Sequence, residues 1–98
     1  MAMNFKIFVH RNCENVHLKL TGDFDGSSAY ELLDVMRRNS FRASKVFIHT
    51  ESLKQIEPFG REVFRNNLNA VKTTSLRLLF TGNNARQLAP EESQICSV

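Results

Sequence analysis

Three carboxylates are the first candidates for chemistry in this sequence. Asp23 and Asp25 are separated by one residue, and Glu57 follows a predicted strand and loop. Convergent carboxylates can bind a divalent cation or act as an acid and base pair. An Asp-x-Asp pair and one Glu do not complete a coordination shell, and both residue types are common in turns and helix caps. We therefore interpret them as turn and cap residues and expect no metal site.

The three histidines are the second group with possible catalytic or metal-binding chemistry. His17 falls on the solvent side of a predicted strand, and His10 and His49 fall at the ends of two others. Histidine titrates near neutral pH and is a common metal ligand, but at strand edges it is more often polar surface. We interpret all three as surface residues.

The possible nucleophiles lack the partners that catalysis requires. Cys13 lies in a predicted turn near Arg11, which would lower a thiol pKa, but no base is within reach in the sequence. Cys13 and Cys96 form no CxxC motif and have no zinc-type spacing to histidine. Ser27 and Ser28 lack a Gly-x-Ser-x-Gly context and are better suited to capping a helix. With four glycines the chain has no phosphate-binding loop. We expect no enzymatic activity and no cofactor.

The composition predicts one soluble domain that spans residues 1–98. Hydrophobic residues make up 42% of the chain, which is enough for a core. The net charge is +3, but the basic residues are scattered and form no run. A local basic corner of Arg37, Arg38, Arg42 and Lys45 is interpreted as solvated surface. We therefore expect no nucleic-acid partner.

Neither a signal peptide nor a membrane-spanning segment is evident. The amino-terminal residues lack an apolar core, and no stretch approaches 18 apolar residues. We expect a cytoplasmic protein with reduced thiols and no membrane insertion.

The hydrophobic pattern predicts an α/β fold. Residues 16–20 alternate between apolar and polar, as in a half-buried strand, while apolar residues between 29 and 36 recur at helical spacing. The predicted elements are strands at 5–9, 16–20, 45–49 and 76–80, with turns at 11–15 and 21–26. Helices are predicted from 27 or 28 to 39, from about 58 to 71, and at 85–88; residues 94–98 are either a last edge strand or a tail. The order is β-β-α-β-α-β-α, with a possible final β. This order predicts a mixed sheet of four or five strands with helices mainly on one face.

Three ordered motifs resemble the STAS domain, the sulfate-transporter and anti-sigma-factor-antagonist module. The first is Leu-Thr-Gly-Asp-Phe-Asp-Gly-Ser-Ser-Ala at 20–29, and the second runs from Val46 to Leu53 and through Ile56 to Gly60. The third is Leu-Arg-Leu-Leu-Phe-Thr-Gly at 76–82. Spacing and element order agree with the family from residue 5 to about residue 90. The resemblance implies a bacterial regulatory protein of anti-sigma-antagonist type that binds other proteins and has no catalytic role.

The sequence departs from the family at the start of its second helix. Glu57-Pro58-Phe59-Gly60 stands where the family carries Asp-Ser-Ser-Gly or Asp-Thr-Ser-Gly. By position, Phe59 replaces the regulatory phospho-acceptor, and Pro58 replaces the hydroxyl residue before it. A phenyl ring offers no oxygen to a kinase, so we expect no phospho-acceptor here. Phe59 is either a core residue or an exposed apolar anchor for a partner.

The resemblance also implies where a partner would bind. The predicted partner-binding residues are Asp23, Asp25, Glu57, Pro58, Phe59, Gly60, Arg61 and Arg65. The partners implied are an anti-sigma factor, a signalling complex or a membrane transporter whose cytosolic subunit this would be. A second hypothesis is a nucleotide or lipid sensor, with a pocket framed by residues 22–28 and the helix start at Gly60. A helix start suits anions, but Glu57 already places a carboxylate there, and Arg61 is the basic residue close to it.

Overall fold

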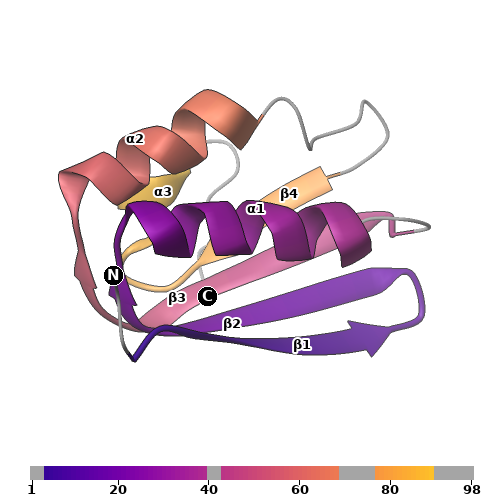
Figure 1. Ribbon diagram of the computed structural model, residues 1–98. Coiled ribbons are helices and arrows are strands. Elements are labelled where there is room, and N and C mark those ends of the chain that lie inside the picture. The colour runs from indigo at the N-terminus through magenta and orange to yellow at the C-terminus, as the bar shows by residue number, and fades with distance from the viewer. Residues whose placement is uncertain (1–3, 40–42, 69–76, 90–98) are drawn as a thin grey trace.

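A four-stranded sheet with helices packed on one face forms the molecule (Figure 1). The computed structural model describes residues 4–39, 43–68 and 77–89. Its elements in chain order are β1 (Lys6–Asn12), β2 (Asn15–Phe24), α1 (Gly26–Asn39), β3 (Lys45–Ile56), α2 (Pro58–Asn67), β4 (Arg77–Thr81) and α3 (Ala85–Leu88). The predicted α/β class and element order are confirmed over these residues. The possible strand at 94–98 and the end of the second helix at 69–71 lie outside them.

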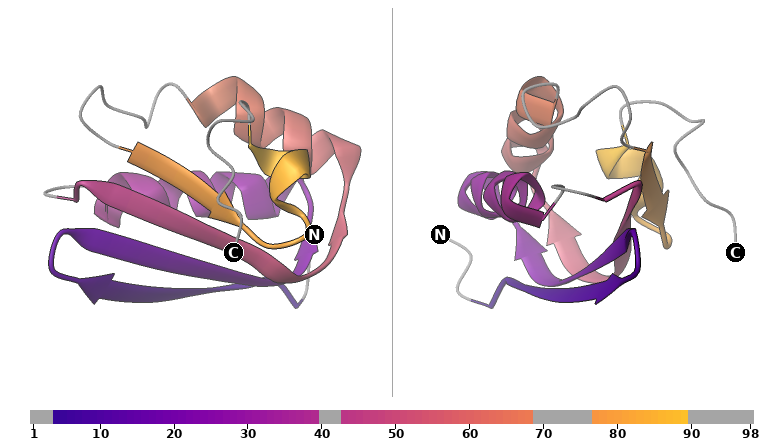
Figure 2. Two further views of the ribbon diagram at one scale, coloured as in Figure 1. Left: turned by 180° about the vertical axis from the view of Figure 1, so that it is seen from behind. Right: turned by 90° about the vertical axis from the view of Figure 1, so that its right-hand side faces the viewer.

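The sheet is mixed and has the strand order β1-β2-β3-β4. β1 and β2 form an antiparallel hairpin, and its turn places Cys13 at a positive φ of 57°. β2 pairs with β3, and β3 with β4, in parallel. Each parallel pair is joined across a helix, α1 for the first and α2 for the second, so these two helices lie on the same side of the sheet (Figure 2).

Both central strands are longer than the sequence pattern predicted. β2 continues through Phe24, so the predicted turn at 21–26 is wrong for its first four residues. β3 continues to Ile56, and the loop predicted after residue 49 is strand instead. The two strands supply each other's backbone hydrogen bonds as far as the pair Phe24 and Ile56, with register shifts that absorb extra residues in β3. Pairing therefore overrides the low strand propensity of Gly22 and Asp23.

The core lies between the sheet and the helices. Alternate residues of β2, β3 and β4 are buried beneath one face of α1 and α2, as the period of two requires. At its centre, the ring of Phe64 on α2 meets Phe24 of β2 at 6.2 Å and Phe80 of β4 at 6.0 Å, both edge to face. These three rings join the helix layer to two strands.

The opposite face of the sheet carries no described element. In the right-hand view of Figure 2, α1 and α2 lie on one side of the strands, and no helix among the described residues lies on the far side. The alternate residues that point there, such as His17, Phe47 and Leu79, are partly exposed, whereas their neighbours Val16, Ile48 and Phe80 are buried. We call this surface the open sheet face.

Candidate partner-binding surface

Asp25 holds the beginning of α1. Its carboxylate accepts hydrogen bonds from the backbone N–H of Ser28 at 2.9 Å and from the hydroxyls of Ser27 and Ser28, both at 3.0 Å. The prediction that Ser27 or Ser28 caps this helix is therefore wrong. Because β2 ends at Phe24 and α1 begins at Gly26, the residue between them, Asp25, is the N-cap, and the two serines donate hydrogen bonds to it.

The ionised form of Asp25 is favoured in the folded protein. The backbone N–H of Ser28 above all, with the two serine hydroxyls, lowers the pKa of Asp25 to about 2, against a smaller opposing effect of burial. Because the folded pKa lies below the ordinary value of 3.8, the ionised cap stabilises the protein above about pH 4. That contribution is lost as the pH falls through 2.

We expect Asp25→Ala to lower the free energy of unfolding by about 1 kcal/mol, within the range of about 0.5–2 kcal/mol for lost N-caps. Asp25→Asn keeps a neutral acceptor and should cost less at pH 7. Urea unfolding between pH 7 and pH 2 measures both effects. The advantage of wild type over Asp25→Asn should shrink between pH 4 and pH 2, and a constant difference would show that the carboxylate charge is irrelevant.

The start of α2 is pressed against the Asp25 backbone. A Cβ atom added to Gly60 would lie 2.7 Å from both the carbonyl carbon and the carbonyl oxygen of Asp25. The backbone N–H of Glu57 donates to the carbonyl oxygen of Phe24 at 2.9 Å. Glu57 occupies the N-cap position and Pro58 follows at the first turn, but the Glu57 side chain makes no capping bond. The two helix starts thus form one rigid corner.

Phe59 is exposed at this corner. Its side chain keeps 66% of its accessible surface, the largest exposed fraction among the large hydrophobic residues that the structure describes. The covered part of its ring lies against Gly26, where an added Cβ would come within 2.6 Å of the ring. Of the two alternatives for Phe59, burial in the core is wrong.

The remaining predicted residues divide into two groups. Asp23 lies just before the corner, and its carbonyl oxygen lies 3.1 Å from the Ser28 hydroxyl, whose single proton it shares with the Asp25 carboxylate. Arg61 follows Gly60 on the first turn of α2. Arg65 instead ties α2 to α3, since its guanidinium donates to the carbonyl oxygens of Arg86 at 3.2 Å and Ala89 at 3.0 Å. We define the helix-start surface as Asp23, Asp25, Glu57, Pro58, Phe59, Gly60 and Arg61.

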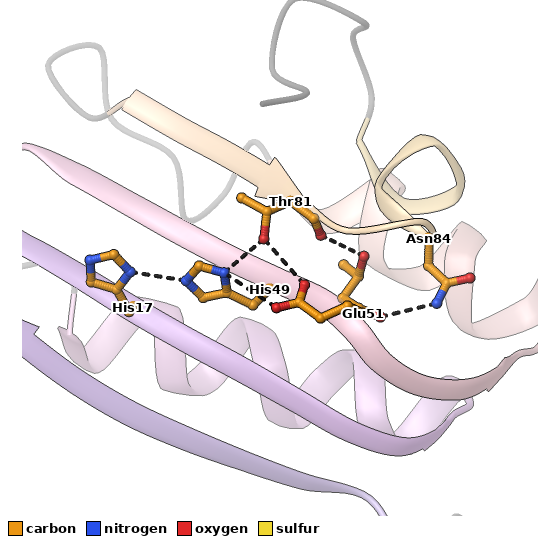
Figure 3. A network of polar contacts seen from close by, with 6 residues as sticks. His17, His49, Glu51, Thr81 and Asn84 are labelled. Atoms are coloured by element: carbon orange, nitrogen blue, oxygen red, sulfur yellow. Dashed lines mark hydrogen bonds and ion pairs between the residues drawn. The ribbon is translucent and has the colours of Figure 1, made fainter. Parts of the chain in front are cut away.

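A hydrogen-bonded chain of side chains on the open sheet face was not predicted (Figure 3). Nδ1 of His17 lies 2.9 Å from Nε2 of His49, and Nδ1 of His49 lies 2.7 Å from the hydroxyl of Thr81. That hydroxyl donates to Glu51 at 3.4 Å. Because the Thr81 hydroxyl has one proton and donates it to Glu51, it accepts the hydrogen bond from the Nδ1–H of His49. The Nε2 of His49 is then the acceptor for the Nδ1–H of His17.

The chain links three strands and fixes the orientation of both imidazoles. Partial burial, and then the nearby His49 and His10, lower the pKa of His17 below its ordinary value of 6.5. His49 lies in the interior of β3 and not at a strand end as predicted. Alternation along each strand could have placed each imidazole on this face, but the contact between them depends on strand register.

Neither a metal site nor a membrane span is found in the described parts of the chain. Within residues 4–39, 43–68 and 77–89, no group of three or more His, Cys, Asp or Glu side chains is arranged to hold a metal ion. No helix in these ranges is both long and apolar enough to cross a membrane.

A comparison with solved structures identifies the fold. The anti-sigma factor antagonist SpoIIAA in its unphosphorylated form superposes with a TM-score of 0.67 at 12% sequence identity, covering 96% of this chain and 88% of that one. This chain has the STAS fold of that antagonist. At this level of identity the similarity establishes the fold. No protein-family model and no curated protein matches the sequence.

The same STAS-type fold also matches part of a larger protein. The structure of Mglu in its L-glutamate binding form has a TM-score of 0.69 at 15% identity and matches 85% of this chain. A second Mglu structure has a TM-score of 0.65 at 20% identity and matches 74%. This chain spans less than a third of those Mglu chains, with coverage of 28% and 18%.

Proposed function

We propose that this chain is a non-catalytic, STAS-type regulatory module that binds another protein through the helix-start surface. The observation that carries the proposal is Phe59, a large apolar side chain that is 66% exposed at the first turn of α2. In the resemblance described above, this is the position of the phospho-acceptor in anti-sigma factor antagonists. The partner is therefore an anti-sigma-factor-like or signalling protein in the bacterial cytoplasm, and no phosphate is added at this position to control its binding.

The surroundings of Phe59 suit an anchor residue. Aromatic side chains dominate binding hot spots when they enter a pocket of the partner from a rigid base. The base is rigid here because Gly60 touches the Asp25 backbone and Asp25 caps α1. Glu57 stands two residues before Phe59 in the sequence and Arg61 two residues after it. They supply one negative and one positive charge for a polar rim, as interfaces commonly have.

The alternative of a nucleotide or lipid sensor has less support. A phosphate at this corner would meet two carboxylates, Asp25 and Glu57, with Arg61 as the basic residue of the helix-start surface. The Asp25 carboxylate already accepts the N–H and hydroxyl donors at the start of α1. Little of the positive end of α1 is thus left for an anionic ligand.

We expect Phe59→Ser to weaken partner binding at least tenfold, which corresponds to about 1.4 kcal/mol. Affinity capture from a bacterial lysate with identification by mass spectrometry finds the partner, and calorimetry with the purified partner then measures the dissociation constant. Phe8→Ser is the matched control, because Phe8 is 55% exposed on the opposite face of the sheet. The control should bind like wild type. Equal affinity of Phe59→Ser and wild type would refute the proposed surface.

A further inference from the structure

Four basic residues that are far apart in the sequence lie on the open sheet face. Lys19 of β2 pairs with Phe8 of β1 and with His49 of β3, and paired residues point to the same face of a sheet. Lys45 pairs with Arg77 of β4 and lies four residues before His49 on β3. By the same alternation Lys6 stands two residues before Phe8. Each of the four strands therefore contributes one cation to this face.

The four strands carry fewer acidic residues than cations. Asp23 and Glu51 are the acidic residues within the four strand ranges, and both lie toward the carboxyl ends of β2 and β3, at the end of the sheet where Lys6 pairs with Thr21. Glu51 already accepts a hydrogen bond from the Thr81 hydroxyl. Lys19, Lys45 and Arg77 lie in the first half or the middle of β2, β3 and β4, so the strand positions of this part of the open sheet face carry a net positive charge.

Aromatic rings lie among the cations in a fixed arrangement. The rings of His17 and Phe47 are stacked at 4.6 Å with an angle of 7° between their planes, and His17 and His49 are equally parallel at 5.2 Å. The hydrogen-bonded chain to Thr81 holds the imidazoles in place. Phe8 adds a ring that is 55% exposed on β1. None of these four rings is buried.

We propose that the open sheet face binds single-stranded nucleic acid. Proteins that bind single strands combine cations that follow the phosphate backbone with aromatic rings that stack on the bases, and a four-stranded sheet can serve as such a platform. Here Lys6, Lys19, Lys45 and Arg77 would contact phosphates, and Phe8 with the His17–Phe47 stack would contact bases.

Two other occupants fit this face less well. A second copy of the chain would place like charges opposite each other, which opposes association. An acidic polypeptide would satisfy the cations but would leave the exposed ring of Phe8 without a planar partner. The sequence alone suggested no nucleic-acid partner because the cations are scattered along it, and strand register gathers them.

Fluorescence anisotropy with the full chain tests the proposal. The probes are labelled oligo(dT) and oligo(rU) of about 12 nucleotides, within the usual site sizes of about 4–16. Binding should be detectable at about 50 mM salt and should weaken with a slope of about −3 in log affinity against log salt, because up to four phosphates are neutralised at about 0.7 each. The absence of salt-dependent binding to both probes would overturn the proposal.

Matched variants distinguish binding at the open sheet face from nonspecific attraction to the protein's positive charge. Lys19→Ala and Lys45→Ala should each reduce the slope by about 0.7, whereas Arg38→Ala, which removes one exposed cation from α1 on the other side of the sheet, should not change it. Phe8→Ala should weaken binding by about fivefold or more through lost stacking. Equal effects of Lys19→Ala and Arg38→Ala would overturn the assignment to this face. Undiminished binding by Phe8→Ala, with equal competition from poly-glutamate, would instead indicate an acidic polypeptide.

The test is independent of the proposed protein partner. Phe59→Ser should bind both oligonucleotides like wild type, and Lys19→Ala should bind the protein partner like wild type. Circular dichroism of each variant verifies that it is folded.

Discussion

Replacing Phe64 with alanine should lower the free energy of unfolding by about 3–5 kcal/mol. Phe64 has no exposed surface and joins α2 to β2 and β4 through edge-to-face contacts with Phe24 and Phe80. Its removal leaves a cavity at the point where the two layers meet. Since domains of this kind are stable by only about 5–15 kcal/mol, a large part of the stability would be lost.

Urea unfolding measures this effect, and Phe59→Ala is its matched control. Both residues are phenylalanines on α2, but Phe59 is 66% exposed and Phe64 is fully buried. Phe59→Ala should lower the free energy of unfolding by less than about 1 kcal/mol, because substitutions of exposed residues usually have small effects on stability. Similar losses for the two variants would contradict the burial that the structure assigns to them.

Gly60→Ala should destabilise the protein by about 1–2 kcal/mol. The added methyl would lie 2.7 Å from the Asp25 carbonyl, a backbone group that cannot rotate away. Overpacking of this kind costs about 1–3 kcal/mol, and the better helix propensity of alanine returns up to about 1 kcal/mol. For a domain of this size the melting temperature should fall by about 5–15 °C.

Gly26→Ala is the control for this second prediction. An added Cβ at Gly26 would come equally close, at 2.6 Å, but to the far end of the exposed Phe59 ring. The ring can turn aside, so the melting temperature should change little, while partner binding through Phe59 should weaken. Thermal unfolding of both variants decides the matter: equal melting temperatures for Gly60→Ala and wild type would show that the two helix starts are not in rigid contact.

The two phenylalanines of α2 show how far helical periodicity can be trusted. Phe59, Val63, Phe64 and Leu68 recur at helical spacing, and the last three are buried. Phe59 is not buried: it lies in the first turn of α2, its ring rests against Gly26, and 66% of its surface stays exposed. Periodicity indicates which way a side chain points but not whether another element reaches it.

The sequence by itself determined the kinds and order of the elements. Alternation in residues 16–20 and the helical spacing of apolar residues between 29 and 36 are local signals, and each predicted the element that the structure contains. The order of these elements was also enough to predict a mixed sheet with helices on one face. Such signals suffice because backbone periodicity acts over a few neighbouring residues.

Only the tertiary structure decided the features on which the candidate sites depend. Three of these features join residues about 30 positions apart. They are the pairing that extends β2 and β3, the contact between Gly60 and Asp25, and the hydrogen-bonded chain from His17 to Glu51. The same is true of the cations on the open sheet face. Strand register brings these residues together, and register follows from the summed burial and hydrogen bonding of whole strands. No single stretch of sequence contains that information.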